Sequence, residues 1–193
     1  KIREMVQDSI PPSRRDRNPE LFVKILGGGA RTLVFVAGLG GTTRYWETRV
    51  TELAQEHRIV LVDLLGFGRS PKPWVKYSVE RHVDALRRVL APLGPVTLVG
   101  HSLGTWISME ALGQLSDIGR PTLGGKLDGV ILLSPDIDPA VFSKQRECMT
   151  RLPRRFIVFV AQDDAALAFL PPHATPLRHR FRSERSFSFR HFR

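Results

Sequence analysis

The chain has 193 residues, 42% of them hydrophobic, and a formal net charge of +10. This length suits one domain with one sizeable core. No window of the sequence approaches the roughly 18 uninterrupted apolar residues of a transmembrane helix, so none is predicted. The lone cysteine excludes an intramolecular disulfide. Half of the charge excess lies in residues 174–193, so the body of the chain lacks the general basic field that is typical of nucleic-acid binding.

The first 20 residues are polar and contain three prolines, so we expect an irregular arm there. The apolar run at 21–26 predicts a short strand, and a glycine-rich turn leads from it to a buried strand at 32–38. Helical spacing then predicts a helix over 44–57, followed by another buried strand at 58–63. The face of this helix that we expect to be buried consists of Trp46, Val50, Leu53 and Ala54.

The rest of the predicted core repeats this alternation. A helix over 78–94 begins at Ser78, a suitable N-cap, and stops near Pro92 and Gly94. The elements expected after it are a strand at 96–100, a helix at about 103–116, a strand at 129–135, a helix at about 139–150 and a strand at 155–161. Apolar strands that alternate with amphipathic helices predict an α/β fold, in which helices cover both faces of a mostly parallel sheet.

The alternation stops near residue 168. Residues 168–193 contain no aliphatic strand and no helical stripe, and arginine is their only strongly basic residue. We therefore divide the chain into an irregular arm (1–20), a core (21–167) and an atypical Arg/Phe-rich tail (168–193). The chain begins at Lys1, which leaves open a leader upstream. With a single cysteine the chain cannot form an internal disulfide, and this favours a reducing, cytoplasmic location.

One stretch of the core carries a chemical signal: Gly100-His101-Ser102-Leu103-Gly104 lies between a predicted strand and a predicted helix. This setting lifts a serine hydroxyl above the sheet, and backbone N–H groups at the helix start can stabilise developing negative charge. The flanking glycines clear space around the serine. Ligands of such sheets bind at the carboxyl ends of the strands, where this serine lies. The alternative is a glycine-flanked turn with an incidental serine.

Three segments together resemble the α/β-hydrolase superfamily, over about residues 22–167: "VFVAGLGGTTRYW" (34–46), "VLVDLLGFGRSPKP" (60–73) and "VTLVGHSLGT" (96–105). The stretch from residue 129 to 167 is similar to uncharacterised bacterial members. The resemblance implies that Ser102 is the nucleophile and that the backbone N–H groups of Leu39 and Leu103 form the oxyanion hole. Ala37 stands where histidine is commoner, which need not affect a backbone donor. Asp63 and "GFGRS" (66–70) match a loop that shapes the site floor, and we interpret them as architectural.

The resemblance also implies that an acid and then a histidine follow the serine along the chain. Asp164 fits the acid better than its neighbour Asp163, because its spacing after the strand at 155–161 matches the family pattern. Asp136 and Asp138, after the preceding strand, are the alternatives for the acid. For these two we favour a turn or helix-capping role instead.

The candidate base is His191, which lies 27 residues after Asp164. His173 and His179 are weaker candidates. We favour the interpretation that the true base is missing from this chain, together with the last strand and helix of the fold. The three remaining histidines are poor candidates: we expect His101 to point away from the serine hydroxyl, and His57 and His82 to lie on helix surfaces.

These residues predict a serine hydrolase that acts on carboxylic esters through an acyl-enzyme, with a small-molecule ester or acyl substrate and no cofactor or metal. Family members with a cap domain insert a large lid between these last two predicted strands, so the resemblance and the short connection here together imply a capless, open site. The alternative is a non-catalytic binding protein of the same fold without a functional histidine. The tail could also contact nucleic acid or a membrane surface, but we favour a solvated terminus and expect neither nucleic-acid binding nor stable membrane insertion. The oligomeric state is left open.

Overall fold

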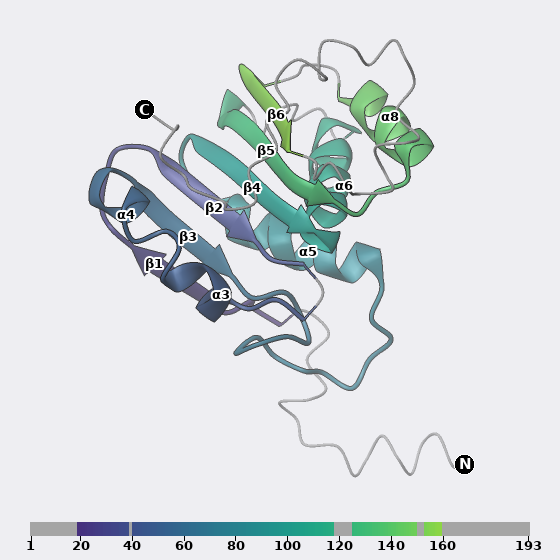
Figure 1. Cartoon of the computed structure of the whole chain (residues 1–193). Coiled ribbons are helices and arrows are strands. Elements are labelled where there is room, and N and C mark those ends of the chain that lie inside the picture. Colours follow the sequence, from purple (N-terminus) through teal and green to yellow (C-terminus); the bar gives the residue numbers. More distant parts are fainter. Residues whose placement is uncertain (1–18, 39, 118–124, 150–152, 160–193) are drawn as a thin grey trace.

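In the part of the chain that the structure describes, six strands form one sheet, in the order β1-β3-β2-β4-β5-β6 (Figure 1). The computed structural model describes residues 19–38, 40–117, 125–149 and 153–159. The strands are β1 (Val23–Leu26), β2 (Thr32–Val36), β3 (Arg58–Val62), β4 (Val96–Ser102), β5 (Leu127–Pro135) and β6 (Arg155–Phe159). All six lie where the apolar runs of the sequence predict strands.

The sheet is mostly parallel, as predicted. β2 to β6 pair in parallel, whereas β1 runs antiparallel to β3 at one edge of the described sheet. The register pairs Val36 of β2 with Gly100 of β4, so these two strands end side by side. Because the carboxyl ends of parallel strands meet at one edge, the segments that follow β2, β3, β4 and β5 converge there.

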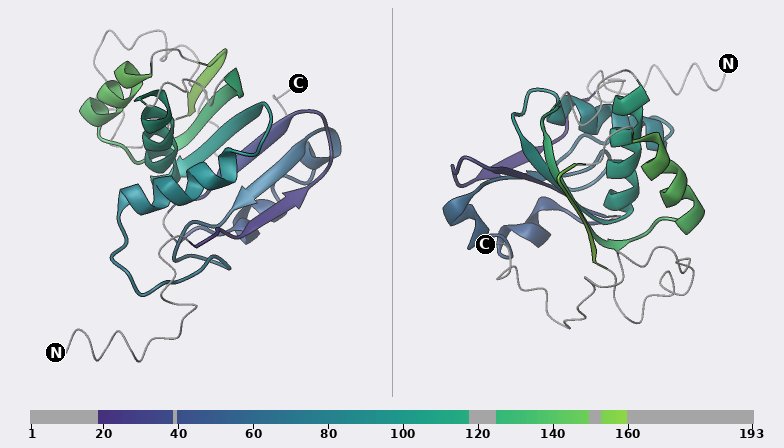
Figure 2. Two further views of the ribbon diagram at one scale, coloured as in Figure 1. Left: turned by 180° about the vertical axis from the view of Figure 1, so that it is seen from behind. Right: turned by 90° about the horizontal axis from the view of Figure 1, so that it is seen from above.

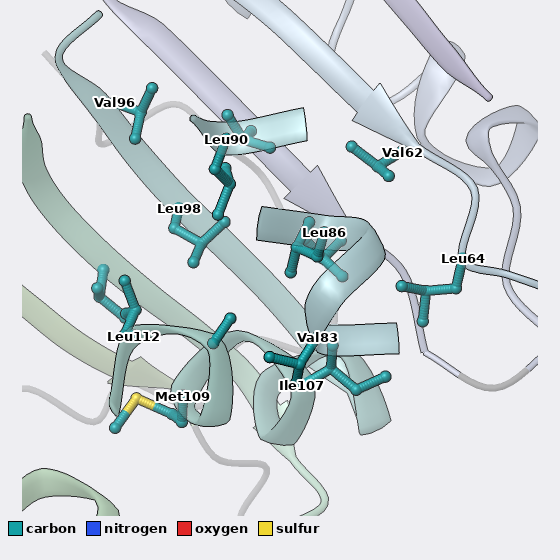
Figure 3. Close-up of a cluster of buried hydrophobic side chains, with 14 of the residues drawn as sticks. Val62, Leu64, Val83, Leu86, Leu90, Val96, Leu98, Ile107, Met109 and Leu112 are labelled. Carbon is teal, nitrogen blue, oxygen red and sulfur yellow. The ribbon is translucent and has the colours of Figure 1, made fainter. Parts of the chain in front are cut away.

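One face of the sheet is covered by α5 (Val79–Leu90), α6 (Leu103–Asp117) and α8 (Pro139–Cys148), as Figure 2 shows. The Ser78 hydroxyl accepts a hydrogen bond from the Arg81 N–H at 3.5 Å, which confirms the predicted cap of α5. Leu86 of α5, Ile107 of α6 and Leu98 of β4 meet in the larger of the two hydrophobic cores that the described residues form (Figure 3). Truncating a side chain such as Leu86 to alanine typically costs about 2–5 kcal/mol.

The opposite face is covered by two short helices, α3 (Thr43–Glu47) and α4 (Leu53–Glu56). The prediction of one continuous helix over 44–57 was therefore wrong. The Thr51 hydroxyl donates to the Glu47 and Thr48 carbonyls, at 3.2 and 3.1 Å, and side-chain bonds of this kind compete with the helical ladder. The four residues predicted to face the core nevertheless do so. Trp46 and Val50 are buried in the second hydrophobic core, which lies on this face of the sheet, and Leu53 and Ala54 pack against it.

The described connection between β5 and β6 consists mainly of α8, which fits the expectation of a capless fold. Asp138 caps α8 by accepting from the N–H groups of Ala140 and Val141. The helix then packs on α6, where Gln145 Nε2 donates to Glu110 Oε2 at 2.9 Å. None of the helices in the described parts of the chain is long and apolar enough to cross a membrane.

Candidate active site

Ser102 lies at the junction of β4 and α6, at the carboxyl edge of the sheet. Its φ of +50° is in the left-handed region, which is costly for a residue with a side chain, by about 1–3 kcal/mol. Among the described residues, the other non-glycine residue with positive φ is Ser134, at +42°. It occupies the register shift between the pairs His101–Leu133 and Ser102–Pro135 of β4 and β5. Strained backbone is thus concentrated beside Ser102, as is common at functional sites.

The two glycines of the Ser102 turn are required by backbone packing. A Cβ at Gly100 would lie 2.9 Å from the Thr105 Cα, inside the turn itself. A Cβ at Gly104 would lie 2.5 and 2.6 Å from the carbonyl oxygens of Val36 and Ala37 at the end of β2. The expectation that both glycines clear space around Ser102 is therefore corrected for Gly104, whose missing side chain lets α6 approach β2.

The backbone that follows β2 lies directly against the Ser102 side chain. A Cβ at Gly38 would be 2.8 Å from the Ser102 Cβ and 3.2 Å from its Oγ. The chain then turns, with the Gly41 N–H donating to the Gly38 carbonyl at 3.0 Å and Gly40 at a φ of +71°. Leu39, the predicted second oxyanion donor, lies outside the described residues.

Leu103, the other predicted oxyanion donor, is the first residue of α6 and follows Ser102 directly. The first N–H groups of an α-helix have no carbonyl partner within the helix, and its N-terminus carries partial positive charge. The Thr105 hydroxyl donates to the Ser102 carbonyl at 2.5 Å and thereby ties the strained residue to the first turn of α6. The structure thus brings Ser102, Gly38 and the start of α6 together.

His101 packs on the side of the sheet that carries α3. Its ring stacks on Tyr45 and meets the edge of Trp46, with 5.9 Å between ring centroids in both pairs. Burial lowers the pKa of His101 and so favours its neutral imidazole. These contacts support the expectation that this side chain does not serve Ser102 as a base.

The other two histidines of the core differ from the expectation of helix-surface side chains. Both His57 and His82 are half-buried, and their Nδ1 atoms are buried without a hydrogen-bond partner among the described residues. His82 lies against the Tyr77 ring, 6.2 Å between centroids, and burial lowers its pKa.

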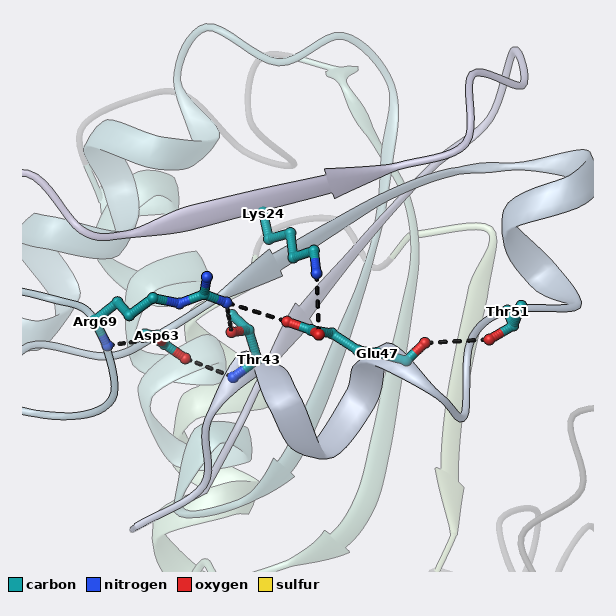
Figure 4. A network of polar contacts seen from close by, with 6 residues as sticks. All are labelled: Lys24, Thr43, Glu47, Thr51, Asp63 and Arg69. Carbon is teal, nitrogen blue, oxygen red and sulfur yellow. Dashed lines mark hydrogen bonds and ion pairs between the residues drawn. The ribbon is translucent and has the colours of Figure 1, made fainter.

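Asp63, which directly follows β3, is buried and binds backbone N–H groups of two different segments (Figure 4). Its Oδ1 accepts from the N–H of Thr43, the first residue of α3, and its Oδ2 accepts from the Arg69 N–H at 2.9 Å. A Cβ at Gly68 would lie 2.2 Å from the same carboxylate, so the 66–70 loop closes tightly around Asp63. This geometry supports the architectural interpretation of Asp63 and its loop.

Only some of the predicted catalytic acids and bases lie within the described residues. Asp138 has the capping role favoured for it, and Asp136 is exposed after β5. Asp163, Asp164, His173, His179 and His191 lie outside the described residues. Among the described residues, no group of three or more His, Cys, Asp or Glu side chains is arranged to hold a metal ion.

Sequence reasoning missed the polar network around α3. Arg69 Nη2 donates to Thr43 Oγ1 at 3.2 Å and contacts Glu47 Oε1 at 3.1 Å, and Lys24 Nζ contacts Glu47 Oε2 at 3.0 Å (Figure 4). The residues come from three separate stretches of sequence. The sequence feature that could have indicated this network is Asp63 at the end of a buried strand, because a buried carboxylate requires hydrogen-bond partners.

Comparison with known proteins yields hydrolases and a protein without assigned function. An uncharacterised protein of Mycobacterium tuberculosis is 32% identical over 117 residues, which are 58% of this chain and 34% of that protein. The "probable lysophospholipase BODYGUARD 4" of Arabidopsis thaliana is 30% identical over 65% of this chain and 29% of its own length. Among solved structures, an esterase from a marine microorganism superimposes with a TM-score of 0.53 and 26% identity, covering 63% of this chain and 43% of the esterase.

The chain spans only about a third of the length of these sequence relatives. The match to uncharacterised mycobacterial proteins agrees with the likeness to bacterial members that the sequence indicates. A family model described as "Alpha/beta hydrolase family" matches residues 33–192, which include the core from β2 onward and most of the Arg/Phe-rich tail. The chain therefore belongs to the alpha/beta hydrolase family.

Proposed function

We propose that the protein is a serine hydrolase of carboxylic esters, with Ser102 as its nucleophile. The observation that carries the proposal is the conformation of Ser102: left-handed, at the start of α6, with the Gly38 backbone against its side chain. A folded protein retains such strain only where the surrounding structure enforces it, and here the strain places a hydroxyl beside two backbone segments.

In the proposed reaction, Ser102 Oγ attacks the ester carbonyl carbon while a histidine takes the hydroxyl proton. The N–H groups of Leu39 and Leu103 stabilise the resulting oxyanion. The bond between the carbonyl carbon and the alkoxy oxygen then breaks, and the histidine returns the proton to the departing alcohol. Water, deprotonated by the same histidine, attacks the acyl-enzyme and releases the carboxylic acid together with the free Ser102 hydroxyl.

Ester substrates are favoured by the chemistry named for the relatives. One sequence relative is called a probable lysophospholipase, and one structural neighbour is called an esterase. α8 packs on α6, so the described connection between β5 and β6 adds no layer over the carboxyl edge. An open site of this kind suits accessible ester or acyl substrates.

The first test is covalent labelling of the full-length protein by a fluorophosphonate probe. We expect the wild type to be labelled and Ser102→Ala to be inert, with hydrolysis of a p-nitrophenyl ester lost in the same variant. Ser134→Ala is the matched control, because Ser134 shares the strained backbone but is not the proposed nucleophile. A folded wild-type protein that is not labelled would refute the proposal and favour a non-catalytic binding protein.

We assign the base to His191 and its orienting acid to Asp164. Both lie within residues 33–192, the range that the family model matches, and their order follows the family pattern. His191→Ala is expected to reduce turnover by about 10⁴-fold or more, the usual effect of removing a triad member. His173→Ala and His179→Ala are the controls, and equal activity of all three variants would show that the base lies elsewhere.

A further inference from the structure

The short helix α3 follows the turn from Gly38 to Gly41, and Gly38 lies against the Ser102 side chain. It has only five residues, whereas isolated helices shorter than about 12–15 residues are marginal in water. Its N-cap residue, Thr42, makes no capping hydrogen bond with its own side chain. The position of α3 therefore depends on contacts with other elements, and so does the position of the turn before it.

The first of these contacts is an external cap. Asp63 at the end of β3 accepts the Thr43 N–H, in place of the cap that Thr42 does not supply. Thr43 and Asp63 are both almost completely buried, so water does not replace this bond. A satisfied cap is a large part of what stabilises a helix of one turn, because such a helix has few hydrogen bonds of its own.

The second contact is Arg69, which joins three parts of the network. Its backbone N–H binds Asp63 Oδ2, and its guanidinium binds both the Thr43 hydroxyl and Glu47 at the other end of α3. The guanidinium carbon also lies 4.0 Å from the centre of the Phe22 ring, which restricts the side chain to this direction. Arg69 thus reaches both the first and the last residue of α3.

The third contact is the pair of cations around Glu47. Lys24 of β1 and Arg69 bind the two oxygens of its carboxylate, and Lys24, followed by Arg69, holds the pKa of Glu47 below its ordinary value. Separate surface ion pairs contribute little to stability. Here the pairs share one carboxylate and act together with the buried Asp63 bond, which gives them a defined geometry.

We propose that Arg69 and Glu47, acting with Asp63, are positioning residues for acyl transfer: they hold α3, and thereby the Gly38–Gly41 turn, against Ser102. The proposal rests on the proposed function of Ser102. A backbone donor stabilises an oxyanion only when it is held at the correct distance, and misplacement by about 1 Å can reduce a rate 10²-fold. None of the three side chains is assigned a contact with the substrate.

The test compares Arg69→Gln and Glu47→Gln with wild type in the full-length protein. Asp63→Asn is less informative, since loss of a buried bond could prevent folding. We expect the fluorophosphonate labelling rate and kcat to fall by about 10- to 100-fold while KM stays within about twofold, the pattern of an interaction realised only in the transition state. Arg69→Lys, which keeps the charge opposite Glu47, is expected to recover part of the rate.

A matched control is Arg155→Gln, which removes an ion pair of similar length, 3.2 Å to Asp128, at the opposite end of the strands. This variant is expected to keep wild-type labelling. Hydrogen–deuterium exchange over residues 38–47 supplies a readout independent of activity, and it should be faster in Arg69→Gln and Glu47→Gln but not in Arg155→Gln.

The outcomes separate the two proposals. If wild type is labelled and Arg69→Gln is labelled equally fast, the positioning role is wrong although the serine hydrolase stands. A rate loss that only follows the unfolded fraction, and disappears where both proteins are fully folded, also overturns the positioning role. If wild type itself is not labelled, the proposed function fails and this inference fails with it.

Discussion

Gly38 is the residue whose missing side chain makes room for the Ser102 side chain. In Gly38→Ala the new Cβ would lie 2.8 Å from the Ser102 Cβ, so either the serine or the turn must move. We expect the labelling rate to fall by about 10²-fold, because the hydroxyl and its backbone partners lose their alignment. The unfolding free energy, measured by urea denaturation, should fall by about 1–3 kcal/mol from overpacking.

Gly28→Ala is the matched control for this substitution. A Cβ at Gly28 meets nothing within 4 Å, and its backbone φ is not in the left-handed region. The control is expected to keep both stability and labelling. Wild-type labelling of Gly38→Ala would show that the turn after β2 is not part of the site.

Individual residues of the site differ in how far the sequence could reveal them. Ser102 and its glycines are adjacent in sequence, so local turn chemistry was enough to single them out. Arg69, Glu47 and Lys24 meet through the pairing of β1 with β3 and the packing of α3 on β3, and no local pattern encodes that meeting. The role of Gly104 was likewise hidden, because its neighbours belong to β2.

The contact of α6 with β2 is the element-scale feature that places the helix start next to Ser102. Gly104→Ala would put a Cβ 2.5 Å from the Val36 carbonyl oxygen, which is backbone and cannot rotate away. We expect a loss of about 1–3 kcal/mol or more in unfolding free energy, measured by urea denaturation, and loss of labelling. In contrast, Gly113→Ala in the same helix meets nothing within 4 Å and should stabilise the protein by about 0.5–1 kcal/mol. Equal effects of the two variants would contradict the close approach.

The cap of α8 provides a second element-scale prediction. Asp138→Ala removes the acceptor of two backbone N–H groups and should reduce the unfolding free energy by about 1 kcal/mol, with labelling and turnover unchanged. Asp136→Ala, two residues earlier, is expected to change neither property. If either variant lost turnover without losing stability, the substituted aspartate would be the acid that orients the catalytic histidine, and Asp164 would be rejected.

The elements also show where periodicity fails as a guide. Apolar runs located all six strands, because buried parallel strands are distinctive in composition. The stretch 44–57 has helical spacing of its apolar residues and still forms two short helices. Periodicity reports which side chains face the core. It does not report local competition for the backbone, such as the Thr51 hydroxyl that donates to carbonyls of the preceding turn.

At the scale of the whole molecule, two half-buried histidines make stability depend on pH. Burial lowers the pKa values of His82 and His101 below the ordinary 6.5, so at intermediate pH the unfolded chain binds more protons than the folded one. Their contribution is fully present above about pH 6.5 and is lost as the pH falls through the folded-state pKa values. Glu47 and Glu80, whose pKa values are lowered mainly by hydrogen bonds from Lys24 and Ser78, add a further loss only below their ordinary value of 4.5.

We therefore expect the unfolding free energy, measured by urea denaturation, to decrease steadily between about pH 7 and pH 5, where the carboxylates remain ionised. His82→Gln, with a polar but non-titrating side chain, should flatten part of this slope, and the double variant with His101→Gln should flatten more of it. Asp84→Asn, on the exposed face of the helix that carries His82, is the control that should leave the slope unchanged. A wild-type profile without slope in this window, or an unaltered slope in the double variant, would show that burial of the two rings does not disfavour their charged forms.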